Sequence, residues 1–356
     1  MKKINILSPG FTSPNSAAFL FPLIKFKHAL KNHDFNITIY NTLENRITDC
    51  NFLLVDSKFF KNSWAQDFNG TLETISELNQ KTKLIWCDQS DSTGTFLGQV
   101  LPYVYKYCKA QIIKDRSEYM STHYASRIYA DYYHKKYGIN DKDSFLDQIV
   151  QNKTDLEKIS VSWNSAFMNY GVNYDYILRL RKHIPFNFFL HFSKPRARPE
   201  DERPINFTCR MGISYARETI CYQRKAIKEI LKDQIPTDKL SRTAYFKEMD
   251  RSKICISPFG LGEITLKDFE ALLSGTMLLK PDMSHMKTWP NLFQDQKTCL
   301  FHSWDADDIK EKIDWALSNN NERISIAKTG QNLYESHTLG KEAGQLFAEH
   351  FKTMLS

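Results

Sequence analysis

Short apolar runs recur along the chain, and longer polar stretches with apolar residues at helical spacing separate them. In the first half these runs predict buried strands at Ile4–Leu7, Asn36–Tyr40, Asn51–Asp56, Lys83–Cys87 and Ala110–Ile113. The segment Ala17–Leu30 has the spacing of an amphipathic helix, and the polar segment up to Gln80 predicts another. Strands that alternate with helices predict a parallel, doubly wound α/β sheet with right-handed crossovers.

The second half repeats this alternation. Its predicted strands are Ile205–Cys209, Ile254–Pro258, Thr276–Leu279 and Thr298–Phe301, and its predicted helices are Tyr215–Leu231, Asp305–Leu317 and Leu339–Leu355. The Pro/Arg-rich segment Lys194–Pro199 is the clearest change in composition, so we expect the chain to cross between domains at about Ile184–Pro204. The sequence therefore predicts two domains, residues 1–190 and 191–356.

One stretch, Ile254–Asp282, carries the most specific pattern. Gly260 and Gly262 follow a predicted strand, where the backbone can adopt positive φ or approach a ligand closely. Thr265 then begins a helix with a capping-box signature, and a helix N-terminus favours an anion such as phosphate. Glu270 lies one turn into that helix, where its carboxylate could accept hydrogen bonds from a sugar diol. Alternatively, Glu270 is a solvated surface residue and the glycines only form turns.

The runs SPFGLGE, DFEALLSG and KPDMSH in this stretch resemble the donor-binding segment of GT-B glycosyltransferases, in the group that makes polysaccharide and lipopolysaccharide. The resemblance implies a GT-B fold, with two Rossmann-like domains facing a cleft and the nucleotide-sugar donor on the second. It also implies that the final helix packs back on the first domain. It also implies that Glu270 binds the ribose and Glu263 the donor sugar or phosphate. Six residues separate these glutamates, where retaining families usually have seven, so the stereochemistry is not predicted.

The predicted donor contacts combine this loop and helix with charged side chains that follow other strands. They are Gly260, Gly262, Ile264, Thr265, Glu270, Arg210, Arg217 and His285. Arginine suits a diphosphate because its planar fork can hold two phosphate oxygens, whereas Arg224 and Lys225 are interpreted as surface charges.

A general base is expected after a strand of the first domain. Asp88 and Asp91 flank the exit of the strand Lys83–Cys87, and Asp115 ends the next one. We prefer Asp91, since Asp88 is closer to the strand end and better placed to hold the loop. The catalytic candidates are therefore Asp91, Asp88 and Glu263, with Asp115 left open as a base, and each aspartate could instead be a turn or N-cap acid.

Composition narrows the classes of function. The chain has 356 residues and a net charge of +7, without a dense basic block, which does not indicate a nucleic-acid partner. Seven scattered cysteines predict reduced thiols in a cytoplasmic protein, and the start MKKINILSPG predicts a strand instead of a signal peptide. No run is long enough for a transmembrane helix, so any contact with the inner membrane should be peripheral.

No cofactor or metal is predicted, and the donor is a substrate. Asp305-Ala306-Asp307 has DxD spacing but starts a predicted helix, so capping explains it. HExxH, P-loop and GxSxG motifs are absent from the sequence. We therefore predict a metal-independent glycosyltransferase acting on a saccharide or lipid-linked saccharide in bacterial surface polysaccharide synthesis. The alternatives are a nucleotide-sugar epimerase or a phosphorylase of the same fold, and a non-catalytic subunit that binds partners or glycans.

Overall fold

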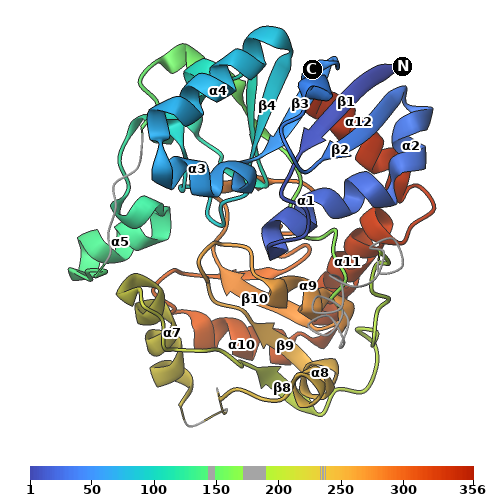
Figure 1. Cartoon of the computed structure of the whole chain (residues 1–356). Helices are drawn as coiled ribbons and strands as arrows, with labels where there is room; N and C mark the ends of the chain where they lie inside the picture. Colours follow the sequence, from blue (N-terminus) through green and yellow to red (C-terminus); the bar gives the residue numbers. More distant parts are fainter. Residues whose placement is uncertain (143–148, 171–189, 233, 235, 237) are drawn as a thin grey trace.

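The protein has two parallel β-sheets with helices packed around them (Figure 1), in a computed structural model that describes residues 1–142, 149–170, 190–232, 234, 236 and 238–356. The first sheet has six strands in the order β2-β1-β3-β4-β5-β7, and the second has four in the order β12-β10-β9-β8. Every pairing within these two sheets is parallel. The predicted fold class, two doubly wound parallel α/β sheets facing a cleft, is confirmed.

Four strands of the first sheet, β1 to β4, come from the predicted runs of the first half of the chain, whereas β5 and β7 were not predicted. Its strands are β1 Lys2–Leu7, β2 Phe35–Tyr40, β3 Phe52–Asp56, β4 Lys83–Asp88, β5 Lys106–Lys109 and β7 Ile159–Val161. The helices of this half are α1 Pro14–Lys25, α2 Lys27–Asn32, α3 Lys61–Gln66, α4 Phe68–Lys81 and α5 Ile128–Tyr137. Short 3₁₀ turns lie at Asn45–Thr48, Ser57–Phe60, Gly98–Tyr103, Arg116–Met120, Tyr124–Ser126 and Lys153–Lys158.

The second sheet follows the predicted strands of the second half. Its strands are β8 Ile205–Thr208, β9 Ser252–Ile256, β10 Met277–Pro281 and β12 Leu300–His302. The helices are α7 Glu218–Leu231, α8 Arg242–Asp250, α9 Leu266–Leu273, α10 Ile309–Ser318, α11 Asn320–Thr338 and α12 Ala343–Leu355. The predicted helix over Leu339–Leu355 therefore begins at Ala343, and α11 was not predicted.

One predicted strand joins the two halves of the molecule. The run Ala110–Ile113 was expected to belong to the first sheet, but β5 occupies that place. Its last residues form β6 (Gln111–Ile113), which pairs antiparallel with β11 (Met286–Thr288) from the second half. This two-stranded ribbon fixes the first sheet against the segment that follows β10.

Helices cover both faces of the first sheet, as a doubly wound domain requires. Phe19 of α1 and Phe347 and Phe351 of α12 belong to one apolar cluster with the strands β1 and β3. The opposite face packs against α4 through Ile75 and Leu78. In Figure 1, α12 lies beside α1 and α2, so the end of the chain crosses from the second sheet to the first.

The aromatic helix α5 links the first half to the second. Tyr129 donates a 2.8 Å hydrogen bond to the carbonyl of Gly260, and Tyr133 donates a 2.6 Å one to that of Trp304. The aromatic face of this helix therefore packs against the second half of the chain.

The predicted crossing at 184–204 begins in residues that lie outside the described part of the chain, and the domain limits at 190 and 191 stay a prediction. None of the described helices is long and apolar enough to cross a membrane.

Candidate functional site

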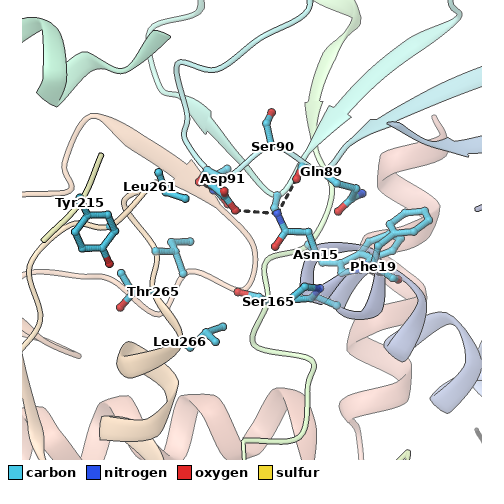
Figure 2. A pocket seen from close by; sticks show the side chains of 18 of the residues that line it. Asn15, Phe19, Gln89, Ser90, Asp91, Ser165, Tyr215, Leu261, Thr265 and Leu266 are labelled. Carbon is cyan, nitrogen blue, oxygen red and sulfur yellow. Dashed lines mark hydrogen bonds between the residues drawn. The ribbon is translucent and has the colours of Figure 1, made fainter. Parts of the chain in front are cut away.

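A cavity of about 420 Å³ lies between the two halves of the molecule. One wall comes from the start of α1, the loop after β4 and the segment after β7, and the other from the loop between β9 and α9. Figure 2 shows side chains from both walls, with Asn15 and Asp91 on one and Thr265, Leu266 and Tyr215 on the other. The carboxyl ends of parallel strands are where α/β sheets bind ligands.

Asp91 lines the cavity and is exposed to solvent. Its Oδ1 accepts a 2.8 Å hydrogen bond from Nδ2 of Asn15, which also donates to the carbonyl of Gln89 (Figure 2). Gln111 donates to the Asp91 carbonyl. Three hydrogen bonds from two neighbours therefore position the loop, while the carboxylate remains open to a ligand in the cavity.

Asp88 occupies a different environment. It is buried, and its Oδ2 lies 2.8 Å from the Lys109 ammonium and accepts a hydrogen bond from Tyr107. Burial alone would raise the pKa of Asp88, but Lys109 and the hydrogen bonds from Ser90 hold it below its ordinary value. The geometry suits a residue that holds the loop, which is the role the sequence favours for Asp88.

The loop before α9 forms the opposite wall through Gly260, Gly262, Ile264 and Thr265, all four predicted. Thr265 and Asp268 make the predicted capping box. Neither glycine has positive φ. Gly262 is needed for a close approach instead, because a Cβ there would lie 1.9 Å from the Asp91 carbonyl oxygen.

Glu263 lies beneath this loop with no exposed surface. It accepts hydrogen bonds from the Thr93 amide at 3.0 Å and the Thr93 hydroxyl at 2.6 Å, and His285 Nε2 lies 3.5 Å away. Burial would raise the pKa of Glu263, but the bonds from His285 and Thr93 keep it lower than usual. The structure thus joins two predicted residues, Glu263 and His285, behind the cavity wall and not on it.

Arg224 was interpreted as a surface charge, and this was wrong. It is buried, it lines the cavity, and its guanidinium lies over the Tyr215 ring at 4.6 Å. Three of its five N–H groups bond to the carbonyls of Phe259 and Gly212. Within the described residues no carboxylate pairs with it, so it brings uncompensated positive charge to the wall.

The sequence does carry a signal for Arg224. It falls on the apolar face of α7, at helical spacing from Ile220, Ile227 and Leu231, all of which are buried. An arginine at such a position must either extend to solvent or find partners inside. By contrast, Lys225 is exposed, as predicted.

Glu270 is buried on α9 but is not among the residues that line the cavity. Its carboxylate accepts a 2.9 Å hydrogen bond from Tyr245 and lies 3.2 Å from Arg242, both on α8. The interpretation of Glu270 as a solvated surface residue is therefore wrong.

The two predicted arginines are not placed together at the cavity. Arg210 follows β8, and its Nε lies 2.9 Å from Oε1 of Glu248. Arg217 is the N-cap residue of α7. Asp115 is exposed and accepts hydrogen bonds from Ser117. Neither Arg210 nor Asp115 is therefore among the residues that line the cavity, although the Arg210 carbonyl accepts a hydrogen bond from Lys267 of α9.

Comparison with known proteins finds a family match in the second half of the chain. Residues 222–348 match a family model described as glycosyl transferase-like. Among proteins with curated descriptions, none matches the chain.

Similar solved structures cover nearly the whole chain at low identity. Anabaena HepE in complex with UDP-glucose is 8% identical at a TM-score of 0.44, with 99% of this chain and 100% of HepE covered. The T4 phage β-glucosyltransferase is 12% identical at 0.45, with 99% of each chain covered. S. aureus MnaA with UDP is 12% identical at 0.41, with 100% of this chain and 97% of MnaA covered.

Asp305, in the glycosyl transferase-like segment, has a role other than the predicted one. It was expected to cap a helix, but α10 begins at Ile309 and Asp305 instead accepts hydrogen bonds from Tyr132, Tyr137 and Lys136 of α5. This contact ties α5 to the second sheet. Over the described ranges, no group of three or more His, Cys, Asp or Glu side chains is placed to hold a metal ion.

Proposed function

We propose that the protein is a glycosyltransferase that moves a sugar from a nucleotide-sugar donor to a saccharide or lipid-linked saccharide. The observation that carries this proposal is the cavity between the sheets, which has Arg224 on one wall and the exposed carboxylate of Asp91 on the other. An uncompensated arginine beside a glycine loop suits a diphosphate. An exposed carboxylate across the cavity suits a base for an acceptor hydroxyl.

In this scheme the nucleoside diphosphate lies along Gly260–Thr265 and against Arg224. As the bond between the anomeric carbon and the diphosphate oxygen breaks, Arg224 stabilises the charge that develops on the leaving group. If configuration inverts, Asp91 accepts the proton of the acceptor hydroxyl whose oxygen forms the new glycosidic bond. Asn15 keeps the Asp91 carboxylate directed toward the cavity.

Glu263 is assigned to holding the loops in place, because it is fully buried beneath them. Its hydrogen bonds to Thr93 keep the donor loop against the loop that carries Asp91. In this scheme the Glu270 carboxylate also accepts a hydrogen bond from the ribose, while it keeps its contacts with Tyr245 and Arg242. This contact comes from the resemblance and is part of the proposal, whereas the donor contact that the resemblance implies for Glu263 is not kept.

A role in bacterial surface polysaccharide synthesis, in the cytoplasm or at the inner membrane, rests on the resemblance of SPFGLGE, DFEALLSG and KPDMSH. Metal independence is proposed because Arg224 and the α9 N-terminus offer positive charge where other transferases use a cation. We expect activity to survive EDTA. Loss of activity in EDTA, with rescue by Mg²⁺ or Mn²⁺, would contradict this point.

A thermal-shift screen over UDP-, GDP-, dTDP-, ADP- and CMP-sugars tests the donor site directly. We expect one nucleotide family to raise the melting temperature of the wild-type protein and to do so less in Arg224→Gln. A donor that is turned over only when a saccharide is added supports transfer. Turnover without any acceptor would indicate an epimerase, and no shift with any nucleotide would favour a non-catalytic binding subunit.

A further inference from the structure

A second cavity, of about 310 Å³, opens in the first domain next to the proposed active site. The two cavities meet at Ser90, which lines both. The second one lies at the carboxyl ends of β3 and β4, between the 3₁₀ turn Ser57–Phe60 and the segment Thr95–Leu97. Its volume is at the lower end of the range for small-molecule sites, which suits a single sugar residue.

The walls of this cavity carry a net positive charge. Lys58 and Lys61 line it, and neither forms an ion pair with the residues that the structure describes. The one carboxylate on the wall, Asp88, is already neutralised by Lys109 at 2.8 Å. Two lysines therefore line the hollow without an ion pair, although Lys58 also attracts the buried carboxyl of Asp56, and the ligand that fits them is an anion.

The remaining wall is aromatic. The rings of Trp64 and Trp86 meet edge to face with centroids 6.0 Å apart, and both line the cavity together with Phe96. The Trp86 side chain is 1% exposed, and its Nε1–H has no hydrogen-bond acceptor within the described ranges. This N–H is itself closed to solvent, so the accessible part of the aromatic wall is the half-buried Trp64 ring. Indole faces also pack well against the C–H face of a sugar ring.

We propose that this cavity binds an acidic group, a carboxylate or a phosphate, on the acceptor saccharide. The inference rests on the proposed function, because it needs a donor in the first cavity. The acceptor would then occupy the second cavity, on the other side of Ser90. An acceptor held here presents its neighbouring hydroxyl toward Asp91, since Ser90 and Asp91 are adjacent in the same loop. The lysines would then select acidic acceptors over neutral ones.

Isothermal titration of the full chain with three probes tests this assignment. The probes are methyl β-glucuronide, glucose 6-phosphate and the neutral methyl β-glucoside, so the two acidic ones distinguish a carboxylate from a phosphate. We expect one acidic probe to bind about tenfold or more tightly than the neutral probe. This advantage should shrink as salt rises from about 50 mM to about 500 mM. Binding should also change indole fluorescence, and less so in Trp64→Phe.

The decisive variant is Lys58→Met/Lys61→Met. The control is Lys81→Met, which removes an exposed lysine at the end of α4 that does not line the cavity. The double variant should lose the preference for the acidic probe, and the control should keep it. Nucleotide binding, measured on the same proteins by thermal shift, should be unchanged in both. Equal binding of acidic and neutral probes, or full affinity in the double variant, would overturn the inference.

The two proposals fail in different ways. If a nucleotide sugar binds and no acidic probe does, the acidic acceptor is wrong and the proposed function stands. If an acidic probe binds through the lysines and no nucleotide binds, the site takes an anion but its role as an acceptor site is overturned.

Discussion

Glu263 accepts a 2.6 Å hydrogen bond from the hydroxyl of Thr93, and this bond joins the loop before α9 to the loop after β4. The two residues are 170 positions apart in sequence and are both buried. Next to them, Gly262 packs so closely on the Asp91 backbone that no side chain would fit. The two loops that carry the proposed donor and acceptor groups are therefore held as one unit.

Thr93→Val should destabilise the protein, because it keeps the size of the side chain and removes one donor from a buried carboxylate. We expect the free energy of unfolding to fall by about 1–3 kcal/mol, measured by urea denaturation. Combined with Glu263→Gln in a double-mutant cycle, the two changes should be clearly non-additive. Thr353→Val, on the exposed side of α12, is the matched control and should change little. Additive effects would show that the bond contributes nothing of its own.

Arg224→Gln should weaken nucleotide binding by about 1.5–3 kcal/mol, the usual contribution of a hydrogen bond to a charged group. Arg224→Lys keeps the charge but loses the planar fork, so its affinity should lie between those of Arg224→Gln and the wild type. The neighbouring exposed residue supplies the control, Lys225→Gln. Titration with the nucleotide found in the screen measures all three. Equal affinities in wild type and Arg224→Gln would remove the guanidinium from the donor site.

Strands such as β3, β9 and β10 could be predicted from sequence because each is a short, largely apolar run, the pattern of a strand buried on both faces. The run Ile254–Pro258, for example, becomes β9 within two residues at each end. The strand β5, with the sequence KYCK, has no such run and was not predicted. The pairing partner of the strand at Ala110–Ile113 could not be predicted in the same way. Its propensity for a strand is clear, but the choice between β4 and the distant β11 depends on where the second half of the chain lies.

The candidate site was predictable where one continuous segment makes it, and not where separate segments meet. Gly260, Gly262, Ile264 and Thr265 are local, and all four line the cavity. Arg224 was missed because its partners, the carbonyls of Phe259 and Gly212, come from two other segments. The burial of Glu263 likewise depends on Thr93, which no local pattern links to it.

Asp91→Asn should lower turnover by roughly 10²–10⁴-fold if the enzyme inverts, because an amide cannot accept the proton of the acceptor hydroxyl. Donor affinity should not change, since the variant keeps its size and can still accept the hydrogen bond from Asn15. Asp115→Asn is the control, at an exposed turn acid of the same domain. Near-normal turnover in Asp91→Asn would mean another base or a retaining reaction. NMR of the anomeric proton of the product would distinguish these two.

The buried pair Asp88–Lys109 should give the largest effect on stability. Lys109→Met leaves a carboxylate buried without its cation, and breaking such a pair usually costs about 3–5 kcal/mol. Asp88→Asn/Lys109→Met should recover part of this loss, because no unpaired charge remains inside. Urea denaturation of the two variants and the wild type at pH 7 measures the difference. A double variant less stable than Lys109→Met would show that the loss does not come from an unpaired carboxylate.

The same pair fixes the sign of a pH dependence. Because Lys109 and Ser90 hold the pKa of Asp88 below its ordinary value, the carboxylate stabilises the wild type fully above its unfolded pKa of about 3.9. That contribution is lost as the pH falls through the lower folded pKa. In Lys109→Met, burial has no opposing cation and raises the pKa of Asp88, so the carboxyl takes up a proton at higher pH than in the wild type. The stability gap between wild type and Lys109→Met should therefore be widest near neutral pH and narrow toward pH 4. A gap that stays constant over this range would show that Asp88 is not the group left unpaired.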